Sequence, residues 1–257
     1  LAEISRPQFA SIPIIVLTGE ANDETEKKVL DQGAWDFITK PYQPVILKTR
    51  LKNAIARSRM GMYEKMKALA EHDALTGLYN RKYLDDYVEN MLQANRSGGT
   101  SRNGKKFAAI MLDIDNFKLI NDQFGTLEGD QILREIGKTL SDVVANLNGI
   151  GGRISGDDFA VLIPNTNDDF SIVSILKEKK LSIFDKHAVV FSEGCYLVSD
   201  LKLSANSIYD RAYIAKQSVK GRYDIHIAYF DDSMLEKLVN NQQIIAGIGR
   251  AVSERQF

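Results

Sequence analysis

Short apolar runs of strand length alternate along this chain with longer stretches of helical pattern. The two longest uninterrupted runs, Ile12 to Leu17 and Phe107 to Leu112, have six residues each. A membrane-spanning helix needs roughly 20 such residues, so we expect no membrane span. Strands separated by helices favour an α/β fold with buried sheets.

The N-terminal region has the pattern of a parallel strand-helix-strand unit. Residues 12–17 are apolar and rich in β-branched side chains, residues 23–32 have a helical pattern that ends before Gly33, and residues 35–39 form a second short apolar segment. A strand, a helix and a strand in this order are typical of parallel α/β units.

A long helix is expected after this unit. No proline or glycine occurs between Pro44 and Arg59, and the apolar residues fall at helical spacing. Gly61 interrupts the pattern once, and the apolar stripe then continues to Leu69. Such a stripe either packs on its own domain or pairs with a second copy of the chain, and the pattern alone leaves both open.

The remaining sequence interleaves helices and strands with one hairpin, which indicates an α/β sandwich with a mixed sheet. The expected helices are 81–95, 128–144, 171–180 and 207–220, the expected strands are 107–113, 188–191 and 225–230, and the hairpin spans 153–163.

Composition limits the function classes that remain. The 257 residues correspond to roughly 1.7 domains of average size. Lysine plus arginine number 33 against 34 acidic residues, so the chain is not a polybasic nucleic-acid binder. The single cysteine, Cys195, excludes an internal disulfide framework, and residues 1–10 lack the pattern of a signal peptide. A reducing, cytoplasmic setting is therefore expected.

Two acidic segments are candidates for chemistry. Asp113 and Asp115 follow an apolar strand at spacing i, i+2, which places both carboxylates on one side of the backbone; such residues are also common in solvated turns. Asp157 and Asp158 lie in a Ser-Gly-Asp-Asp turn that could be a plain β-turn. Together, two acidic edges of one sheet could hold Mg²⁺ against a triphosphate.

These segments belong to three blocks that resemble the signature of the GGDEF family. The blocks are D-x-L-T-G-L-x-N-R from Asp73, D-I-D-x-F-K-x-I-N-D from Asp113 and R-x-S-G-D-D-F from Arg153. Members of that bacterial family are diguanylate cyclases, which condense two GTP into cyclic di-GMP and two pyrophosphates, or degenerate relatives that serve as regulatory modules. The resemblance implies a nucleotidyl-cyclase-like α/β sandwich with a mostly antiparallel central sheet. It also implies a homodimer, because each domain binds one GTP.

The resemblance also implies a role for individual residues. The implied ligands of Mg²⁺ or Mn²⁺ are the Asp113 and Asp157 side chains and the Ile114 carbonyl. The implied GTP contacts are Asn121 and Asp130 on guanine, with Gly156, Lys216 and Lys220 near the phosphates. The implied catalytic residues are Asp157, Asp158 and Lys118.

The third block departs from the family pattern at two positions. Ser155 and Asp158 stand where the family has glycine and glutamate. Aspartate is one methylene shorter, and a displacement of about 1 Å in a reacting group can cost on the order of 100-fold in rate. A catalytically degenerate, GTP-binding or dimerising module is therefore the alternative to a cyclase. Asn146 and Gly149 replace the family's inhibitory Arg-x-x-Asp, so we expect no feedback site.

The two flanking regions resemble other signalling domains. Residues 12–58 resemble the C-terminal part of a response-regulator receiver domain, a flavodoxin-like fold, with Thr18, Phe37 and Lys40 as switch residues and a histidine kinase as the implied upstream partner. Its phospho-accepting aspartate is expected on an earlier strand that this sequence does not contain. The region from Met234 resembles the lead-in to an EAL phosphodiesterase domain, although a simple C-terminal helix fits equally well. The expected layout is a receiver part at 1–58, a helical linker at 59–70, a GGDEF-like domain at 71–232 and a C-terminal helix at 233–257.

Overall fold

The computed structural model of the chain describes residues 12–19, 23–97, 107–164, 171–178, 186–187, 189–222, 225–240 and 244. The chain divides into two compact units, Leu1–Ala70 and Glu71–Phe257, which are described separately. Among the described residues, no helix combines the length and the apolar character that crossing a bilayer requires.

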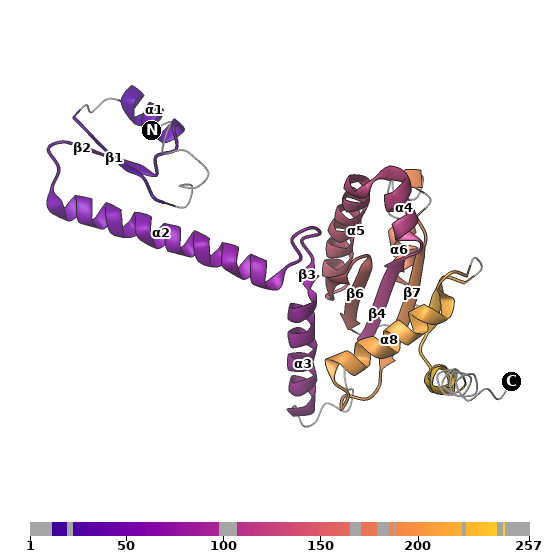
Figure 1. Ribbon diagram of the computed structural model, residues 1–257. Helices are drawn as coiled ribbons and strands as arrows, with labels where there is room; N and C mark the ends of the chain where they lie inside the picture. Colours follow the sequence, from indigo (N-terminus) through magenta and orange to yellow (C-terminus); the bar gives the residue numbers. More distant parts are fainter. Residues whose placement is uncertain are drawn as a thin grey trace, which may run out of the picture. The chain divides into compact units, whose positions relative to one another are not determined.

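The first unit contains a two-stranded parallel sheet. β1 (Ile15–Thr18) pairs with β2 (Asp36–Thr39) in a register that runs from Ile15 opposite Asp36 to Thr18 opposite Thr39. α1 (Asp23–Asp31) connects the strands (Figure 1). Gly33, with a φ of 91°, follows the helix in the left-handed conformation that glycine adopts without steric cost. The predicted strand-helix-strand arrangement with parallel pairing is confirmed.

α2 (Pro44–Glu71) is a continuous helix of 28 residues, about 42 Å long at 1.5 Å per residue. It runs through Gly61, so the expected interruption of the stripe does not break the helix. Ala54 is its single buried residue among the described part of the chain, and most of its large apolar side chains are exposed.

The second unit is built on a six-stranded sheet in the order β3-β5-β6-β4-β7-β8. The neighbouring pairs β5/β6, β6/β4 and β4/β7 are antiparallel, whereas β3/β5 and β7/β8 are parallel. The expected mixed, mostly antiparallel sheet is confirmed. The strands are β3 (Tyr79–Asn80), β4 (Phe107–Ile114), β5 (Ile150–Ser155), β6 (Asp158–Pro164), β7 (Phe191–Val198) and β8 (Ile227–Tyr229).

Helices cover both faces of this sheet (Figure 1). On one face, α5 (Thr126–Asn146) and α6 (Ile172–Glu178) pack on alternate residues of β4, among them Ile110. On the other face, α3 (Arg81–Ser97) and α8 (Ala205–Val219) pack on the intervening residues, among them Met111. Every residue of β4 is therefore buried, as is typical of a central strand covered on both sides.

Three elements of the fold differ from the sequence-based expectations. The sequence patterns predict neither the two-residue strand β3 nor the short helix α4 (Phe117–Phe124). The prediction of a strand at 188–191 is wrong, because β7 begins at Phe191 and continues to Val198. Three consecutive residues of β7, Ser192 to Gly194, do not fit an apolar strand pattern, yet they are buried.

The buried Glu193 of β7 has a structural explanation. Its carboxylate accepts hydrogen bonds from Ser171 Oγ at 2.6 Å and from the backbone N–H groups of Ile172 and Val173 at 2.9 and 3.1 Å. It therefore caps the first turn of α6, although burial raises the pKa of its carboxyl.

The C-terminal region is described only in part. Residues 232–240 are helical. The remainder of the predicted C-terminal helix at 233–257, apart from residue 244, lies outside the described residues, and so does most of the segment that resembles an EAL lead-in.

Candidate active site

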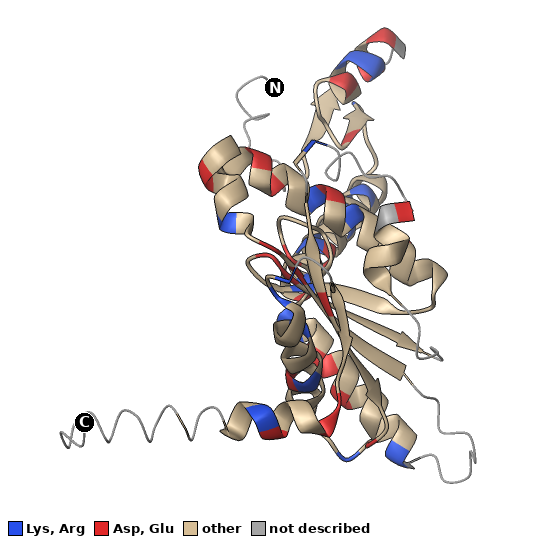
Figure 2. Cartoon of the chain, turned by 90° about the vertical axis from the view of Figure 1, so that its right-hand side faces the viewer, with Lys and Arg blue, Asp and Glu red and all other residues tan. Residues whose placement is uncertain are grey.

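The charged residues of the four long strands gather at one end of the sheet. β4, β5, β6 and β7 carry one charged residue each, and the rest of each strand is uncharged (Figure 2). Leu112 of β4 pairs with Phe159 of β6 and with Glu193 of β7, and Arg153 of β5 also pairs with Phe159. The four charged residues are therefore offset from one another by about one residue along their strands. The four residues are Asp113, Arg153, Asp158 and Glu193.

Asp113 and Asp157 form a carboxyl pair at this end. Asp113 lies near the end of β4 with its side chain 3% exposed, and Asp157 lies in the turn between β5 and β6. The two carboxyl groups are in hydrogen-bond contact, and burial together with the charge of Asp113 raises the pKa of Asp157 to about 6. Two carboxylates at this distance repel each other when both are ionised, so the pair is suited to a cation.

The pair fits a magnesium-type ion better than a transition metal. In the part of the chain that the structure describes, no group of three or more His, Cys, Asp or Glu side chains could hold a metal. Mg²⁺ is usually bound through one or two carboxylates, together with water and substrate phosphate oxygens. Asp113 and Asp157 supply such carboxylates, and the carbonyl of the adjacent Ile114 is the predicted backbone ligand.

Two lysines of the α8 region neutralise these acids. Lys216, which is 1% exposed, forms an ion pair with Asp158, and its ammonium lies 4.7 Å from the ring centroid of Tyr213. Lys220, four residues later, forms an ion pair with Asp113. Burial opposes the charge of Lys220, but the hydrogen bond that its ammonium donates to Asp113, together with the nearby carboxylates, raises its pKa above the ordinary value. The structure thus brings both predicted phosphate-binding lysines to the predicted metal ligands.

A glycine in β7 positions Lys216. A Cβ atom at Gly194 would lie 2.1 Å from the Ala212 carbonyl oxygen and 2.2 Å from the Lys216 backbone nitrogen. Any side chain at Gly194 would therefore separate α8 from the sheet. Glycine inside a strand often marks such a close backbone approach, so Gly194 is the sequence signal for this contact.

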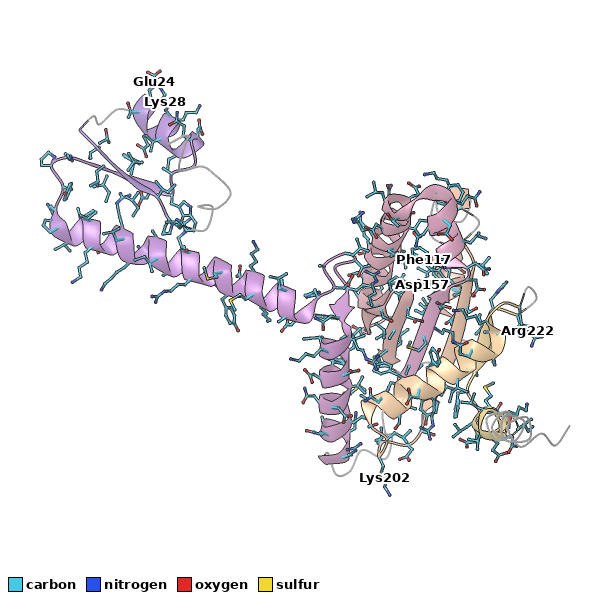
Figure 3. All side chains as sticks on the ribbon, in the orientation of Figure 1. Glu24, Lys28, Phe117, Asp157, Lys202 and Arg222 are labelled. Carbon is cyan, nitrogen blue, oxygen red and sulfur yellow. The ribbon has the colours of Figure 1, made fainter. Side chains whose placement is uncertain are left out.

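The predicted guanine contacts meet where α4 and α5 cross. A Cβ atom at Gly129 would lie 1.9 Å from Asn121 Oδ1, so the Asn121 side chain rests on the backbone of Gly129, the residue next to Asp130. Asp130 is partly exposed and lies 3.8 Å from Arg134. Lys118 is exposed on α4. Figure 3 marks Phe117, at the start of α4, and Asp157 at this end of the sheet.

The tip of the β5–β6 hairpin is held by residues to which the sequence analysis gave no role. Arg153 Nε donates to the Gly156 carbonyl at 2.8 Å, and its guanidinium lies 3.2 Å from Asp73. Asp73 also accepts hydrogen bonds from the backbone N–H and the hydroxyl of Thr76, at 2.9 and 2.7 Å. Gly156 has a φ of 50°, which glycine adopts freely. Asp73 and Arg153 therefore position the turn that carries Asp157.

In the first unit, two of the three predicted switch residues are close. Thr18 ends β1, and the backbone N–H of Lys40 donates to the Thr18 carbonyl at 2.7 Å. Phe37 lies within β2, opposite Val16. The ends of both strands thus lie together. The roles of these residues in a phosphorylation switch stay predictions.

Comparison with known proteins assigns the second unit. A sequence model described as "Diguanylate cyclase, GGDEF domain" matches residues 70–222. The chain belongs to the GGDEF family. This match confirms the family assignment that the three signature blocks predicted.

Individual relatives agree with this assignment. Response regulator PleD of Caulobacter vibrioides is 30% identical over 167 residues, which are 63% of this chain and 36% of PleD. Diguanylate cyclase DgcS of Shewanella oneidensis is 31% identical over 173 residues, which are 63% of this chain and 55% of DgcS. The chain thus matches only part of the length of these relatives.

A solved structure supports the fold. The coiled coil and GGDEF domain of DgcB from Caulobacter crescentus, in complex with c-di-GMP, superposes with a TM-score of 0.59 at 24% identity and covers 73% of this chain and 100% of that chain. At this level of identity the likeness establishes the fold.

Proposed function

We propose that the second unit binds GTP together with Mg²⁺ or Mn²⁺ and, as a dimer, condenses two GTP into cyclic di-GMP with release of two pyrophosphates. The observation that carries this proposal is the contact of Asp113 with both Asp157 and Lys220 at the charged end of the sheet. Carboxylates for a metal and ammonium groups for phosphates lie there within one site.

The chemistry needs positioned charge rather than a covalent intermediate. The ribose 3′-oxygen of one GTP attacks the α-phosphorus of the other, a 3′-O–P bond forms, the bond to the β-phosphate oxygen breaks, and pyrophosphate leaves; the second linkage forms in the same way. A divalent ion held by Asp113 and Asp157 would stabilise charge on the phosphate oxygens. Lys216 and Lys220 would stabilise the same charge, and a nearby carboxylate would accept the hydroxyl proton.

Guanine recognition fits the α4–α5 crossing. The Asn121 amide offers both a donor and an acceptor, and the Asp130 carboxylate accepts from the N–H groups of the guanine edge. Asn121 is held against the backbone of Gly129, so its amide is already oriented. The exposed Lys118, on the same helix as Asn121, would contact a phosphate of the bound GTP.

A dimer is supported by α2. From Ile55 onward, exposed apolar residues recur at spacings of seven, four and three, a pattern typical of a coiled-coil seam. They are Ile55, Met62, Met66 and Leu69. The solved DgcB structure also contains a coiled coil together with its GGDEF domain.

The proposed activity has a direct test. The purified protein is incubated with GTP and Mg²⁺, and the nucleotides are separated by chromatography. We expect cyclic di-GMP and pyrophosphate from the wild-type protein and from Asp142→Asn, an exposed control on α5, and no product from Asp113→Asn. Absence of product from the wild-type protein with either Mg²⁺ or Mn²⁺ would reject the cyclase proposal.

A regulatory GTP-binding module is the second candidate. Asp158 stands where the family has the longer glutamate. Its ion pair with the buried Lys216 favours this candidate, because the carboxylate is already paired. Calorimetry separates the candidates, since the module predicts GTP binding that depends on Asp113 without any turnover.

The flanking regions would supply input and output. The first unit would respond to a histidine kinase through Thr18, Phe37 and Lys40, and a downstream EAL domain would be one partner of the module. A phosphoryl mimic such as beryllofluoride, added to a longer chain that includes the acceptor aspartate, should change cyclase activity or GTP affinity; no change in either would reject this input.

A further inference from the structure

Two aspartates and two lysines lie together at the charged end of the sheet. Leu112 pairs with Phe159 in the antiparallel β4/β6 ladder, so the next residues outward, Asp113 and Asp158, are neighbours across the strands. Lys216 and Lys220 are neighbours one helical turn apart. Each lysine pairs with one acid, Lys216 with Asp158 and Lys220 with Asp113.

The two ion pairs differ in which partner can leave. In the Lys216–Asp158 pair the lysine is 1% exposed and the aspartate 27% exposed. In the Lys220–Asp113 pair the lysine is 43% exposed, whereas Asp113 is 3% exposed. An ammonium on a long side chain that already reaches solvent can move away without being buried elsewhere. Asp113, in contrast, is fixed on β4.

The position of Lys220 conflicts with a metal on Asp113. Its ammonium contacts Oδ2 of the carboxylate that is the predicted metal ligand. A divalent cation at the same oxygen would face a positive charge at contact distance, and this repulsion is large where solvent screening is weak. A metal ion that arrives alone must therefore displace Lys220 into solvent.

A triphosphate provides a better destination for the displaced lysine. Its oxygens carry negative charge and would lie beside the metal, within reach of a side chain that already contacts Asp113. From these observations we infer that Lys220 is an exchangeable counter-ion that holds the metal site closed until nucleotide arrives, and that it passes from Asp113 to the phosphates when the metal and GTP bind. The inference rests on the proposed metal and nucleotide site and adds its regulation.

The consequence is a coupling between two ligands. Metal and nucleotide each bind more tightly when the other is present, and by linkage the factor is the same in both directions. Lys216 does not take part in the exchange, because its ammonium is buried against Asp158 and Tyr213.

The test measures metal binding without any turnover. Mn²⁺ is titrated into nucleotide-free protein at pH 7.5, and free Mn²⁺ is measured by electron paramagnetic resonance. Lys220→Met removes the charge and keeps most of the side-chain length, and we expect it to bind Mn²⁺ about 10-fold more tightly than the wild-type protein. A non-hydrolysable GTP analogue should increase Mn²⁺ affinity strongly in the wild-type protein and much less in Lys220→Met.

Two further variants complete the experiment. Lys202→Met changes the net charge equally but lies before the opposite end of α8 (Figure 3), and it should bind Mn²⁺ like the wild-type protein. Lys220→Arg keeps the charge and should keep the weak binding of metal alone. Thermal denaturation of every variant verifies folding, and Lys220→Gln replaces Lys220→Met if the latter does not fold.

The outcomes separate this inference from the proposed activity. Equal or weaker binding of Mn²⁺ by Lys220→Met, an unchanged effect of the GTP analogue, or no metal binding by any variant would overturn the role of Lys220. Formation of cyclic di-GMP is measured separately with the wild-type protein, so a protein that shows the exchange but makes no product would overturn only the cyclase activity.

Discussion

Lys216 is buried against the carboxylate of Asp158, with 1% of the lysine side chain and 27% of the aspartate side chain exposed. Few lysines are buried so completely, and those that are need a partner for their charge. Asp158 provides this partner from the fourth position of the S-G-D-D-F turn, where the family has glutamate. The residue at this position is therefore part of the fold as well as of the site.

Removal of that carboxylate should destabilise the protein. Asp158→Asn leaves the Lys216 ammonium buried without a counter-charge, which costs on the order of 3 kcal/mol. Urea denaturation at pH 7.5 measures the loss. The exposed Asp142→Asn should change the free energy of unfolding by no more than about 0.5 kcal/mol, and an equally small effect for Asp158→Asn would show that the ion pair does not form.

The adjacent Asp157→Asn should have the opposite effect. The pKa of Asp157 is raised to about 6 in the folded protein, so its ionisation is less favourable there than in the unfolded chain. This penalty is fully present at pH 7.5 and disappears as the pH falls through about 6 towards 4. With allowance for solvent screening, Asp157→Asn should raise the free energy of unfolding by about 1 kcal/mol at pH 7.5.

Thermal denaturation in EDTA checks this effect. The variant should melt about 2–4 °C above the wild-type protein at pH 7.5, and the difference should shrink at pH 5. A variant that melts at the wild-type temperature at both pH values would contradict the close contact between Asp157 and Asp113.

Gly129→Ala should weaken GTP binding without weakening the fold. The new Cβ atom would lie 1.9 Å from Asn121 Oδ1, so the amide must rotate away from the guanine position. The helix itself gains from the replacement of glycine by alanine, by up to about 1 kcal/mol. Calorimetry should show an affinity for GTP about 10-fold lower. Gly61→Ala, at a helical glycine with no atom near its Cβ, should leave GTP affinity unchanged.

Loss of Asp73 should loosen the hairpin tip. Asp73→Ala removes the acceptor for Thr76 and for Arg153, the residue that also holds Gly156. We expect the free energy of unfolding to fall by about 1–2 kcal/mol. Amide hydrogen exchange at residues 154–158 should become faster. Unchanged exchange at the tip would show that the turn is rigid without this support.

The pH dependence of this support has a defined direction. Burial raises the pKa of Asp73, but the hydrogen bonds from Thr76 and Arg153 outweigh it and lower the pKa below the ordinary value. The stabilisation is therefore present above about pH 4 and is lost as the pH falls through the lowered pKa.

Charges on the exposed stripe of α2 should prevent dimerisation. The double variant Met62→Lys, Met66→Lys places two ammonium groups on the predicted seam, and light scattering should give a monomer where the wild-type protein gives a dimer. Glu64→Lys changes the net charge by the same amount but lies off the seam, so it should remain dimeric. A double variant that is still a dimer would exclude α2 as the interface.

The residues of the candidate site can be named from the sequence more fully than the elements that carry them. Short sequence motifs, which can be recognised without knowledge of the fold, contain Asp113, Asp157, Lys216 and Lys220. The structure brings these residues together. The sequence does not predict α4, whose eight residues fall largely within the signature block that begins at Asp113.

The errors in β7 have a physical cause. Glu193 reads as an exposed residue in the sequence, yet it is buried because three donors at the start of α6 satisfy its carboxylate. Those donors lie about 20 residues away in the chain. A local pattern cannot contain a partner that only the tertiary fold supplies, so both the start and the length of the strand were wrong.

The glycine at position 194 limits how this site can evolve. It allows the backbone of α8 to lie directly on β7, which fixes how far the Lys216 ammonium must extend to meet an acid on β6. Aspartate at position 158 spans that gap. A change of acid, lysine or glycine alone would mismatch the other two, so we expect these three positions to vary together among members of the family.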